Sequence, residues 1–326
     1  MSNVVLYAMT EEGTKLPIID VSNAAFTVAA TDAELAVMSE QFVRESTQQR
    51  EMPAPLREAL RQSILGRALM AASGTFLAGM STYLIKLGPD NLGVEMTPVD
   101  RSIAASFPAF TSRLRLQDMA RLLADGLLRT GADDRRPVCL VNIGGGPGSD
   151  SWNALIYLHA EHPDLLLRRK ILIAVLDLDH HGPAFGGRAV EALQAPDAPL
   201  NGLAIGFRHV TYNWSEAGQL REVLDDLHAR DGACAVSSEG GLFEYGSDTE
   251  IVSNLTTLHA GTASDAIVVG SVTREGEAVR ASHTATRIPA RPRTIEAFGS
   301  LVGQAGWLVQ HAIARPFSYH VRMAKA

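Results

Sequence analysis

Residues from about 137 onward alternate short apolar runs with helical segments, and this alternation constrains the fold more than any other feature of the sequence. The expected strands, in chain order, read PVCLVNIG, ILIAVLDLD, FRHVTYNW, GACAVSSE and DAIVVGSVT. Short apolar runs separated by helices are typical of a parallel sheet that is covered on both faces. The sequence therefore predicts an α/β fold with a doubly wound sheet. A helix over GSLVGQAGWLVQHAIA and an edge strand in FSYHVRMAKA are expected to close the chain.

The preceding part of the chain has helical periodicity. From residue 31 to about 128, apolar residues recur at spacings of three and four, and Thr31-Asp32 is a plausible helix start. The apolar pattern over 56–88 predicts two helices broken near Ser73-Gly74, and LQDMARLLADGLLRT predicts another that ends before Gly131. Residues 1–30 contain short extended pieces. We therefore expect an N-terminal helical cap over 1–130 and a ligand-binding domain over 131–326.

Composition and charge exclude several classes of protein. The formal net charge of −7 argues against a nucleic-acid substrate, because neutralising phosphates requires a basic surface. No apolar run is long enough for a membrane span, and no export signal is evident at the N-terminus. Cys139 and Cys234 lie in separate apolar runs without CxxC spacing, which predicts buried packing residues and a reducing compartment. We expect a cytoplasmic protein that binds neither nucleic acid nor membrane. The sequence leaves a homodimer open.

The stretch VNIGGGPGSDSW, residues 141–152, places a bare backbone directly after the first strand of the expected sheet. In such sheets ligands bind outside the carboxyl ends of the strands, and glycines let the backbone approach them closely. A phosphate-binding P-loop requires Gly-Lys-Ser/Thr, whereas this stretch has Gly148-Ser149-Asp150. A dinucleotide fingerprint would need a glycine at Ser149. Both of these phosphate-binding patterns are therefore incomplete.

The stretch from Val141 to Gly148 resembles the glycine loop of class I S-adenosylmethionine (SAM)-dependent methyltransferases, with Gly144, Gly146 and Gly148 in register. The resemblance implies SAM as cosubstrate and a Rossmann-like doubly wound sheet of class I methyltransferase type with an N-terminal helical cap. It also implies that Asp177, with Asp179 in reserve, accepts hydrogen bonds from the ribose hydroxyls. Further cosubstrate contacts are expected on the adenine side and the methionine side, from Asn213, Trp214, Ser237 and Ser238. Asn142 stands where the family has an acid that helps to hold the cosubstrate ammonium group, and Glu239 is the candidate to compensate.

The resemblance leaves the reacting centre open, because the cosubstrate carries the difficult chemistry and the protein aligns a nucleophile and excludes water. Tyr83, Glu239 and Tyr245 are the catalytic candidates, with Lys86 interpreted as a helix-end charge. The sequence contains neither the Asp/Asn-Pro-Pro-aromatic motif of nitrogen-directed nucleic-acid methylation nor a Pro-Cys pair. Together with the helical cap, this favours methyl transfer to a small acceptor of natural-product type.

Two other functions remain open. The segments GMSTYLIKLGPDNLG, VNIGGGPGSDSW and SSEGGLFEYGSD are somewhat similar to methyltransferase-like enzymes that cyclise SAM to azetidine-2-carboxylate and release methylthioadenosine. Asn142 is compatible with that reaction, because the attacking amine must be neutral and a tight carboxylate partner would keep it protonated. The chain is also compatible with a non-catalytic SAM-binding partner subunit.

The sequence Asp177-Leu178-Asp179-His180-His181 has metal-ligating residue types close together. Adjacent histidines in one strand-end loop rarely converge on one ion, so this segment is interpreted as a solvated loop or helix start. No metal is expected.

Overall fold

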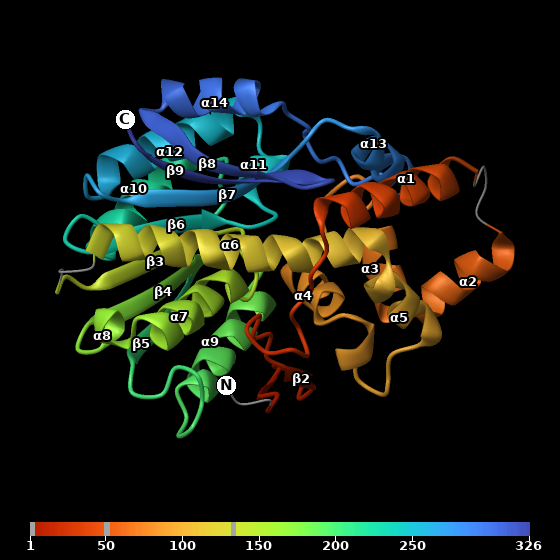
Figure 1. The fold of residues 1–326 in the computed structure, drawn as a ribbon, viewed down its shortest axis with the longest axis horizontal. Helices are drawn as coiled ribbons and strands as arrows, with labels where there is room; N and C mark the ends of the chain where they lie inside the picture. The colour runs from red at the N-terminus through yellow and green to blue at the C-terminus, as the bar shows by residue number, and fades with distance from the viewer. Residues whose placement is uncertain (1–3, 49–52, 132–134) are drawn as a thin grey trace.

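A seven-stranded sheet forms the centre of the computed structural model, which describes residues 4–48, 53–131 and 135–326 (Figure 1). Its strands are β3 (Val138–Ile143), β4 (Lys170–Leu176), β5 (Ala204–Val210), β6 (Ala233–Ser238), β7 (Ile267–Thr273), β8 (Trp307–Ala314) and β9 (Ser318–Lys325). They lie in the order β5-β4-β3-β6-β7-β9-β8, with β3 to β7 parallel and β9 antiparallel to both of its neighbours. The predicted α/β class, with a mainly parallel sheet of the Rossmann-like, doubly wound type, is confirmed.

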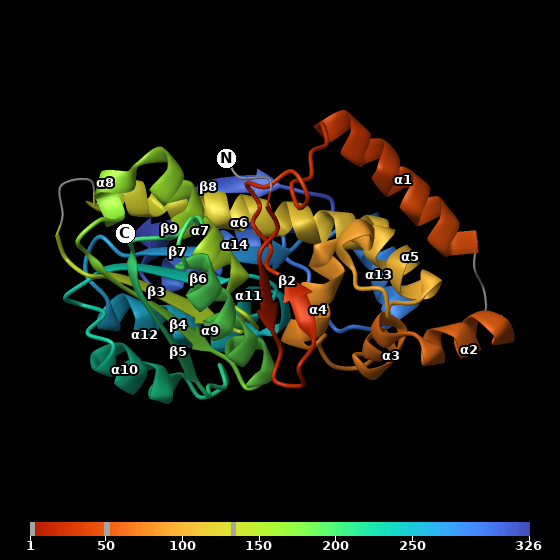
Figure 2. The same cartoon turned by 90° about the horizontal axis from the view of Figure 1, so that it is seen from below.

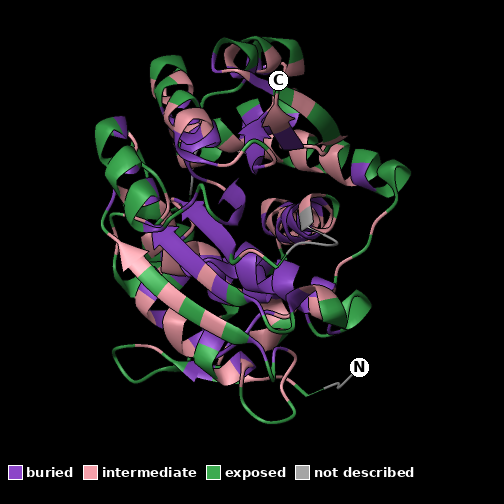
Figure 3. Cartoon of the chain, turned by 90° about the vertical axis from the view of Figure 1, so that its left-hand side faces the viewer, coloured by how far each residue is buried: buried purple, intermediate pink, exposed green. Residues whose placement is uncertain are grey.

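Successive strand residues point to opposite sides of this sheet, so apolar residues lie on both faces, and helices cover each face. Leu140 and Ile173 belong to one apolar cluster, whereas their neighbours Val141 and Ala174 belong to a second. The first cluster includes α6 (Phe107–Gly131), α7 (Ser149–Glu161) and α9 (His181–Leu193). The second includes α10 (Ala217–Asp226), α12 (Asp248–Gly261) and α14 (Ile295–Gln304). Figure 3 shows the buried strands running between helices whose outer sides are exposed.

The N-terminal region consists of a hairpin and several helices. They are β1 (Tyr7–Met9), β2 (Lys15–Pro17), α1 (Asp32–Gln48), α2 (Ala54–Gln62), α3 (Ile64–Ala71), α4 (Gly79–Leu87), the 3-10 helix η1 (Pro89–Asn91) and α5 (Pro98–Ala105). The predicted break near Ser73-Gly74 is present, but a second break occurs at Ser63, whose hydroxyl accepts a hydrogen bond from the Gly66 amide at 2.8 Å and caps α3. α1 and α2 extend away from the sheet (Figure 2).

Helix α6 connects this region to the rest of the molecule. It packs along α7 and against β6, β7 and β9, and its apolar residues belong to the same cluster as one face of the sheet. The boundary near residue 131 between a cap and a ligand-binding domain stays a prediction. The remaining short helices are α8 (Pro163–Leu166), α11 (Leu242–Tyr245) and α13 (Glu277–Thr286).

The C-terminal end of the chain differs from the expectation in two respects. The predicted helix ends at Gln304, and WLVQHAIA forms the edge strand β8, so that β9 lies inside the sheet. Gly306, with φ of +81°, ends the helical stretch in a conformation that favours glycine. Trp307 is then buried, and its indole nitrogen donates to the Leu255 carbonyl at 2.9 Å. Apolar spacing over so short a run does not distinguish a helix from a strand.

The two cysteines lie opposite each other in register on β3 and β6, and both are buried, as predicted for packing residues. Among the described helices, none combines the length and the apolar character needed to cross a bilayer. The expected cytoplasmic location stays a prediction.

Candidate functional site

A cavity of about 330 Å³ lies at the carboxyl ends of β3, β4 and β6, next to α4. The residues that line it are Phe76, Leu77, Ala78, Gly79, Thr82, Tyr83, Lys86, Gly144, Gly145, Gly146, Pro147, Ser149, Asp177, Leu178, Asp179, Tyr212, Trp214, Glu239, Gly240, Gly241 and Tyr245. The fold therefore brings together most of the residues that the sequence singles out. This is the position at which doubly wound sheets bind ligands.

The glycine loop forms one wall, and α4 lies directly on it. Gly146 has φ of +55°, and a Cβ atom built there would come within 2.9 Å of the Gly79 Cα. A Cβ atom on Gly79 would come within 2.7 Å of the Gly146 Cα. Both positions therefore require glycine, because backbone meets backbone at this contact. The start of α4 covers the pocket as a result.

Asp177 links the end of β4 to the glycine loop. Its Oδ2 accepts a hydrogen bond from the Gly146 amide at 2.9 Å, and its Oδ1 accepts one from the Asp179 amide at 3.0 Å. Burial raises the pKa of Asp177 above its usual range, although both amide donors oppose this change. Asp177 and Asp179 both line the cavity, and their contact with ribose hydroxyls stays a prediction.

Three aromatic side chains from separate segments border the cavity. The ring centroid of Phe76 lies 6.1 Å from that of Trp214 and 6.0 Å from that of Tyr245. Trp214 also covers Gly144, since a Cβ atom there would be 2.9 Å from the indole Cζ3. Phe76 is 45% exposed and lies in the loop before α4, where the sequence analysis did not identify it. The sequence signal that could have identified Phe76 was an aromatic residue close to the predicted helix break.

A buried group of charges lies at the end of β6. Glu239 contacts Lys86 Nζ, and its Oε1 accepts from Arg115 Nε at 2.6 Å. Arg115 Nη1 also donates to Glu244 Oε1 at 3.0 Å. Burial acts to raise the pKa of Glu239, but the two cations outweigh it and lower this pKa to about 2. Both Glu239 oxygens are already paired, and Lys86, expected as a helix-end charge, is buried against Glu239.

A second buried acid, Asp150, lies in the first turn of α7. Its Oδ1 accepts from the Ser151 amide at 2.8 Å and from the side-chain amide of Asn142. Burial, with the charge of Glu239, raises the pKa of Asp150 to about 6. Asn142 is fully buried and is not among the residues that line the cavity, and its role as a cosubstrate contact stays a prediction. The sequence signal for Asp150 was an acid two residues after the last glycine of the loop.

The hydroxyl of Tyr83 binds backbone groups of the N-terminal segment. Its ring lines the cavity, but the hydroxyl donates to the Pro17 carbonyl at 2.7 Å and accepts from the Ile19 amide at 3.0 Å. Burial raises the pKa of Tyr83 far above its usual range. The N-terminal segment holds this hydroxyl, and the catalytic role expected of Tyr83 stays a prediction.

Four other predicted cosubstrate contacts lie outside the cavity lining. Ser238 Oγ donates to the Ile143 carbonyl and accepts from the Leu242 amide, and Ser237 is equally buried in β6. Asn213 Oδ1 accepts from the Ser215 amide at 3.1 Å. Gly148 begins α7 with φ of +75°, and a Cβ atom there would lie 2.9 Å from Val175. These residues shape the strand ends and the loop instead of facing the cavity.

Comparison with known proteins identifies similar folds. No family model matches the chain, and no curated protein matches it. A possible exported protein from Bordetella parapertussis is 18% identical, with a TM-score of 0.59 over 91% of this chain and 97% of that one. This similarity shows a shared fold.

Two other solved structures have lower TM-scores. The O-methyltransferase NcsB1 from neocarzinostatin biosynthesis, in complex with S-adenosyl-L-homocysteine and 1,4-dihydroxy-2-naphthoic acid, is 20% identical, with a TM-score of 0.41 over 69% of this chain and 58% of that one. The pyocyanin biosynthetic protein PhzM is 16% identical, with a TM-score of 0.43 over 91% of this chain and 74% of that one. The assignment of the site rests on its own geometry.

Proposed function

We propose that the protein is a SAM-dependent enzyme that transfers a methyl group to a small acceptor. The observation that carries the proposal is the first turn of α7 behind the glycine loop. In dinucleotide-binding folds a pyrophosphate binds to the free amides of this turn. Here the Asp150 carboxylate already accepts from the Ser151 amide, and a second negative charge would be repelled. A cosubstrate without phosphate groups, such as SAM, fits this charge distribution.

The cavity offers suitable partners for the parts of SAM. Asp177 and Asp179 would accept hydrogen bonds from the ribose hydroxyls, since carboxylate oxygens accept more than one bond. Trp214 offers an aromatic face to the adenine, and the glycine loop leaves room for the methionine part. The rings of Phe76 and Tyr245 would attract a sulfonium by cation–π interaction. Bound SAM would supply an electrophilic carbon.

Glu239 and Tyr245, two of the catalytic candidates, are poorly suited to act as a general base. Glu239 has a pKa of about 2 and is held by two cations, while burial beside Glu244 raises the pKa of Tyr245 and keeps its phenol neutral. We infer that catalysis depends on alignment of the two reactants and exclusion of water. The exposed Phe76 beside Tyr245 favours an acceptor with an apolar or aromatic surface.

Thermal stabilisation by SAM and by NAD tests the cosubstrate assignment, since a ligand that binds the native state raises the Tm. SAM should raise the Tm of the wild type, NAD should not, and the SAM effect should be strongly reduced in Asp179→Ala. Asp225→Ala, an exposed position on α10, is the matched control. Stabilisation by NAD alone would contradict the proposal.

Cyclisation of SAM is the second candidate function, and the size of the covered cavity favours it. About 330 Å³ is at the lower end of volumes that hold one drug-sized ligand, and α4 closes the glycine-loop side. Incubation with SAM alone, followed by mass spectrometry, separates the two reactions. Equal amounts of methylthioadenosine and azetidine-2-carboxylate would establish cyclisation, whereas SAM that binds unchanged would direct the search to an acceptor. Binding without turnover on any acceptor would identify a non-catalytic partner subunit.

A further inference from the structure

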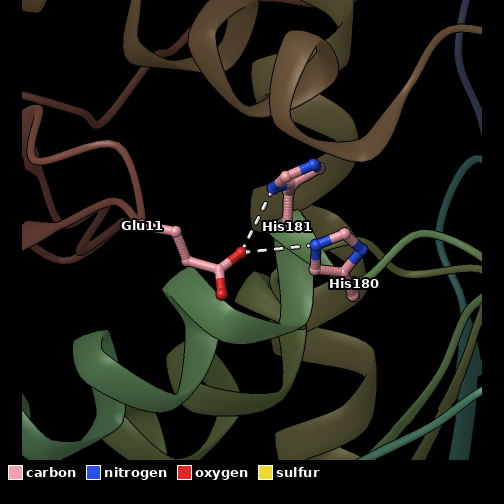
Figure 4. A group of neighbouring side chains, drawn as sticks. All are labelled: Glu11, His180 and His181. Carbon is pink, nitrogen blue, oxygen red and sulfur yellow. Dashed lines mark hydrogen bonds and ion pairs between the residues drawn. The ribbon is translucent and has the colours of Figure 1, made fainter.

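A group of exposed histidine and glutamate side chains lies outside the candidate pocket and takes no part in the proposed reaction. Glu11 and Glu12 come from the turn between β1 and β2, whereas His180 and His181 begin α9. The two segments are far apart in the sequence but adjacent in the fold. Figure 4 shows the Glu11 carboxylate facing both imidazole rings.

The distances between these side-chain atoms suit a single metal ion. Glu11 Oε2 lies 3.2 Å from His181 Nδ1 and 3.6 Å from His180 Nε2. Zinc bonds of 2.0–2.2 Å in a tetrahedral site correspond to ligand–ligand separations of about 3.3–3.5 Å. One ligand atom from each of Glu11, His180 and His181 lies within 4.8 Å of the others, and Glu12 Oε1 lies 3.3 Å from His181 Nδ1. The distances from Glu11 to both histidines and from Glu12 to His181 are therefore close to the spacing that one zinc ion requires.

The surrounding structure holds these groups in position. Met9 of the hairpin accepts a hydrogen bond from Arg188 of α9 at 3.4 Å, and the His181 amide donates to Asp179 Oδ1 at 3.2 Å. The imidazole ring centroids of His180 and His181 are 3.9 Å apart, so the two rings lie side by side. Two imidazoles beside two carboxylates are a ligand set that zinc accepts.

We propose that Glu11, His180 and His181, assisted by Glu12, form a surface zinc site that joins the β1–β2 hairpin to the start of α9. The sequence alone favoured a solvated loop at His180-His181, because adjacent histidines in one loop rarely converge on one ion. The glutamates come from a distant part of the chain. Since Asp177 and Asp179 precede these histidines and line the pocket, the metal would also stiffen that wall. The site is independent of the proposed reaction.

Isothermal titration of the untagged protein with zinc alone tests the proposal. The wild type should bind one equivalent of zinc, and His180→Ala/His181→Ala should weaken that binding at least tenfold. Glu11→Gln, which keeps both histidines, should weaken it to a smaller extent. His228→Ala removes an exposed histidine that pairs with Asp231 at 3.8 Å elsewhere on the surface, and it should leave binding unchanged.

The Tm provides a second readout on the same proteins. Zinc should raise the Tm of the wild type and of His228→Ala, but not that of the double variant. Because all substituted side chains are exposed, the variants should fold without metal. Zinc affinity in the double variant equal to that of the wild type, or no stoichiometric binding to the wild type, would overturn the proposal.

Discussion

At the scale of single residues, the site contains side chains whose chemistry is set by their partners more than by their type. Tyr83 lines the cavity, yet its hydroxyl donates to the Pro17 carbonyl and accepts from the Ile19 amide. Asp150 is an acid at a helix start, yet burial raises its pKa to about 6. Each of these assignments leads to a test at one position.

Replacing Tyr83 with phenylalanine should reduce stability without abolishing the reaction. The change leaves a buried carbonyl and a buried amide without their partner, at a cost of about 2 kcal/mol in the free energy of unfolding. Denaturant unfolding measures this loss, and kcat should remain within a few-fold of the wild type at temperatures where both are folded. Tyr7→Phe, at an exposed ring, is the control. A normal Tm combined with loss of turnover would support a catalytic role for the hydroxyl.

Asp150→Asn should change how stability depends on pH. The folded pKa of about 6 lies above the unfolded value of about 3.9, so the native state binds the extra proton and ionisation destabilises it as the pH rises through this window. The variant should therefore be more stable than the wild type at pH 8, by roughly 2–3 kcal/mol, with the gap closing below about pH 4. Unfolding at several pH values measures the gap, with the exposed Asp164→Asn as control. A stability difference between variant and wild type that widens toward low pH would show that the pKa of Asp150 is not raised in the native state.

At the scale of elements, the site depends on how closely α4 approaches the loop between β3 and α7. Two glycines, Gly79 and Gly146, make that approach, with a contact that leaves no space for a side chain on either backbone. The glycines within the loop could be identified from their motif. Gly79 could not, because its partner lies in a different part of the chain.

Gly79→Ala should weaken SAM binding while leaving the protein folded. The new methyl group would lie 2.7 Å from the Gly146 Cα, so α4 or the loop must move, and we expect an affinity about tenfold lower. Calorimetric titration with SAM measures this change. Gly299→Ala, in α14 with no atom within 4 Å of the new Cβ, should leave the affinity unaltered and slightly stabilise the helix. Equal affinities for both variants would show that the contact is unimportant.

At the scale of the whole molecule, α6 joins the N-terminal region to the C-terminal hairpin of the sheet through partly buried polar contacts. Asp118 on α6 accepts from Arg315 Nε at 2.8 Å and from His320 Nδ1 at 2.8 Å, and Ser318 contacts the other ring nitrogen at 2.9 Å. Burial acts to raise the pKa of Asp118, but these donors outweigh it and lower this pKa. Together with Arg115, these contacts make α6 the link between the two halves of the chain.

Asp118→Asn should lower the free energy of unfolding by about 2 kcal/mol at neutral pH, because Arg315 loses a charged, partly buried hydrogen-bond partner. The folded pKa is depressed, so the contribution of Asp118 is present above about pH 4 and is lost as the pH falls through the folded value. The difference between variant and wild type should therefore narrow in acid. Urea unfolding from pH 7 downward measures it, with the exposed Asp225→Asn as control. A difference independent of pH would argue against the charge as its cause.

The sequence by itself determined the sheet and the walls of the pocket that follow its strands directly. Apolar runs buried on both faces specify parallel strands, and the carboxyl ends of such strands meet at one edge. Gly144, Gly146 and Asp177 could be found for this reason, as could Asp179, since local pattern and topology alone bring them together.

Only the tertiary structure decided which side chains at the site are already paired with other protein groups. Glu239 is paired because Lys86 of α4 and Arg115 of α6 fold onto it, and the Asn142 amide is paired with Asp150. The strand β8 and the Glu11–His181 contact likewise depend on partners from distant parts of the chain. These partners come from distant segments, and the local sequence pattern does not show which distant side chains will meet.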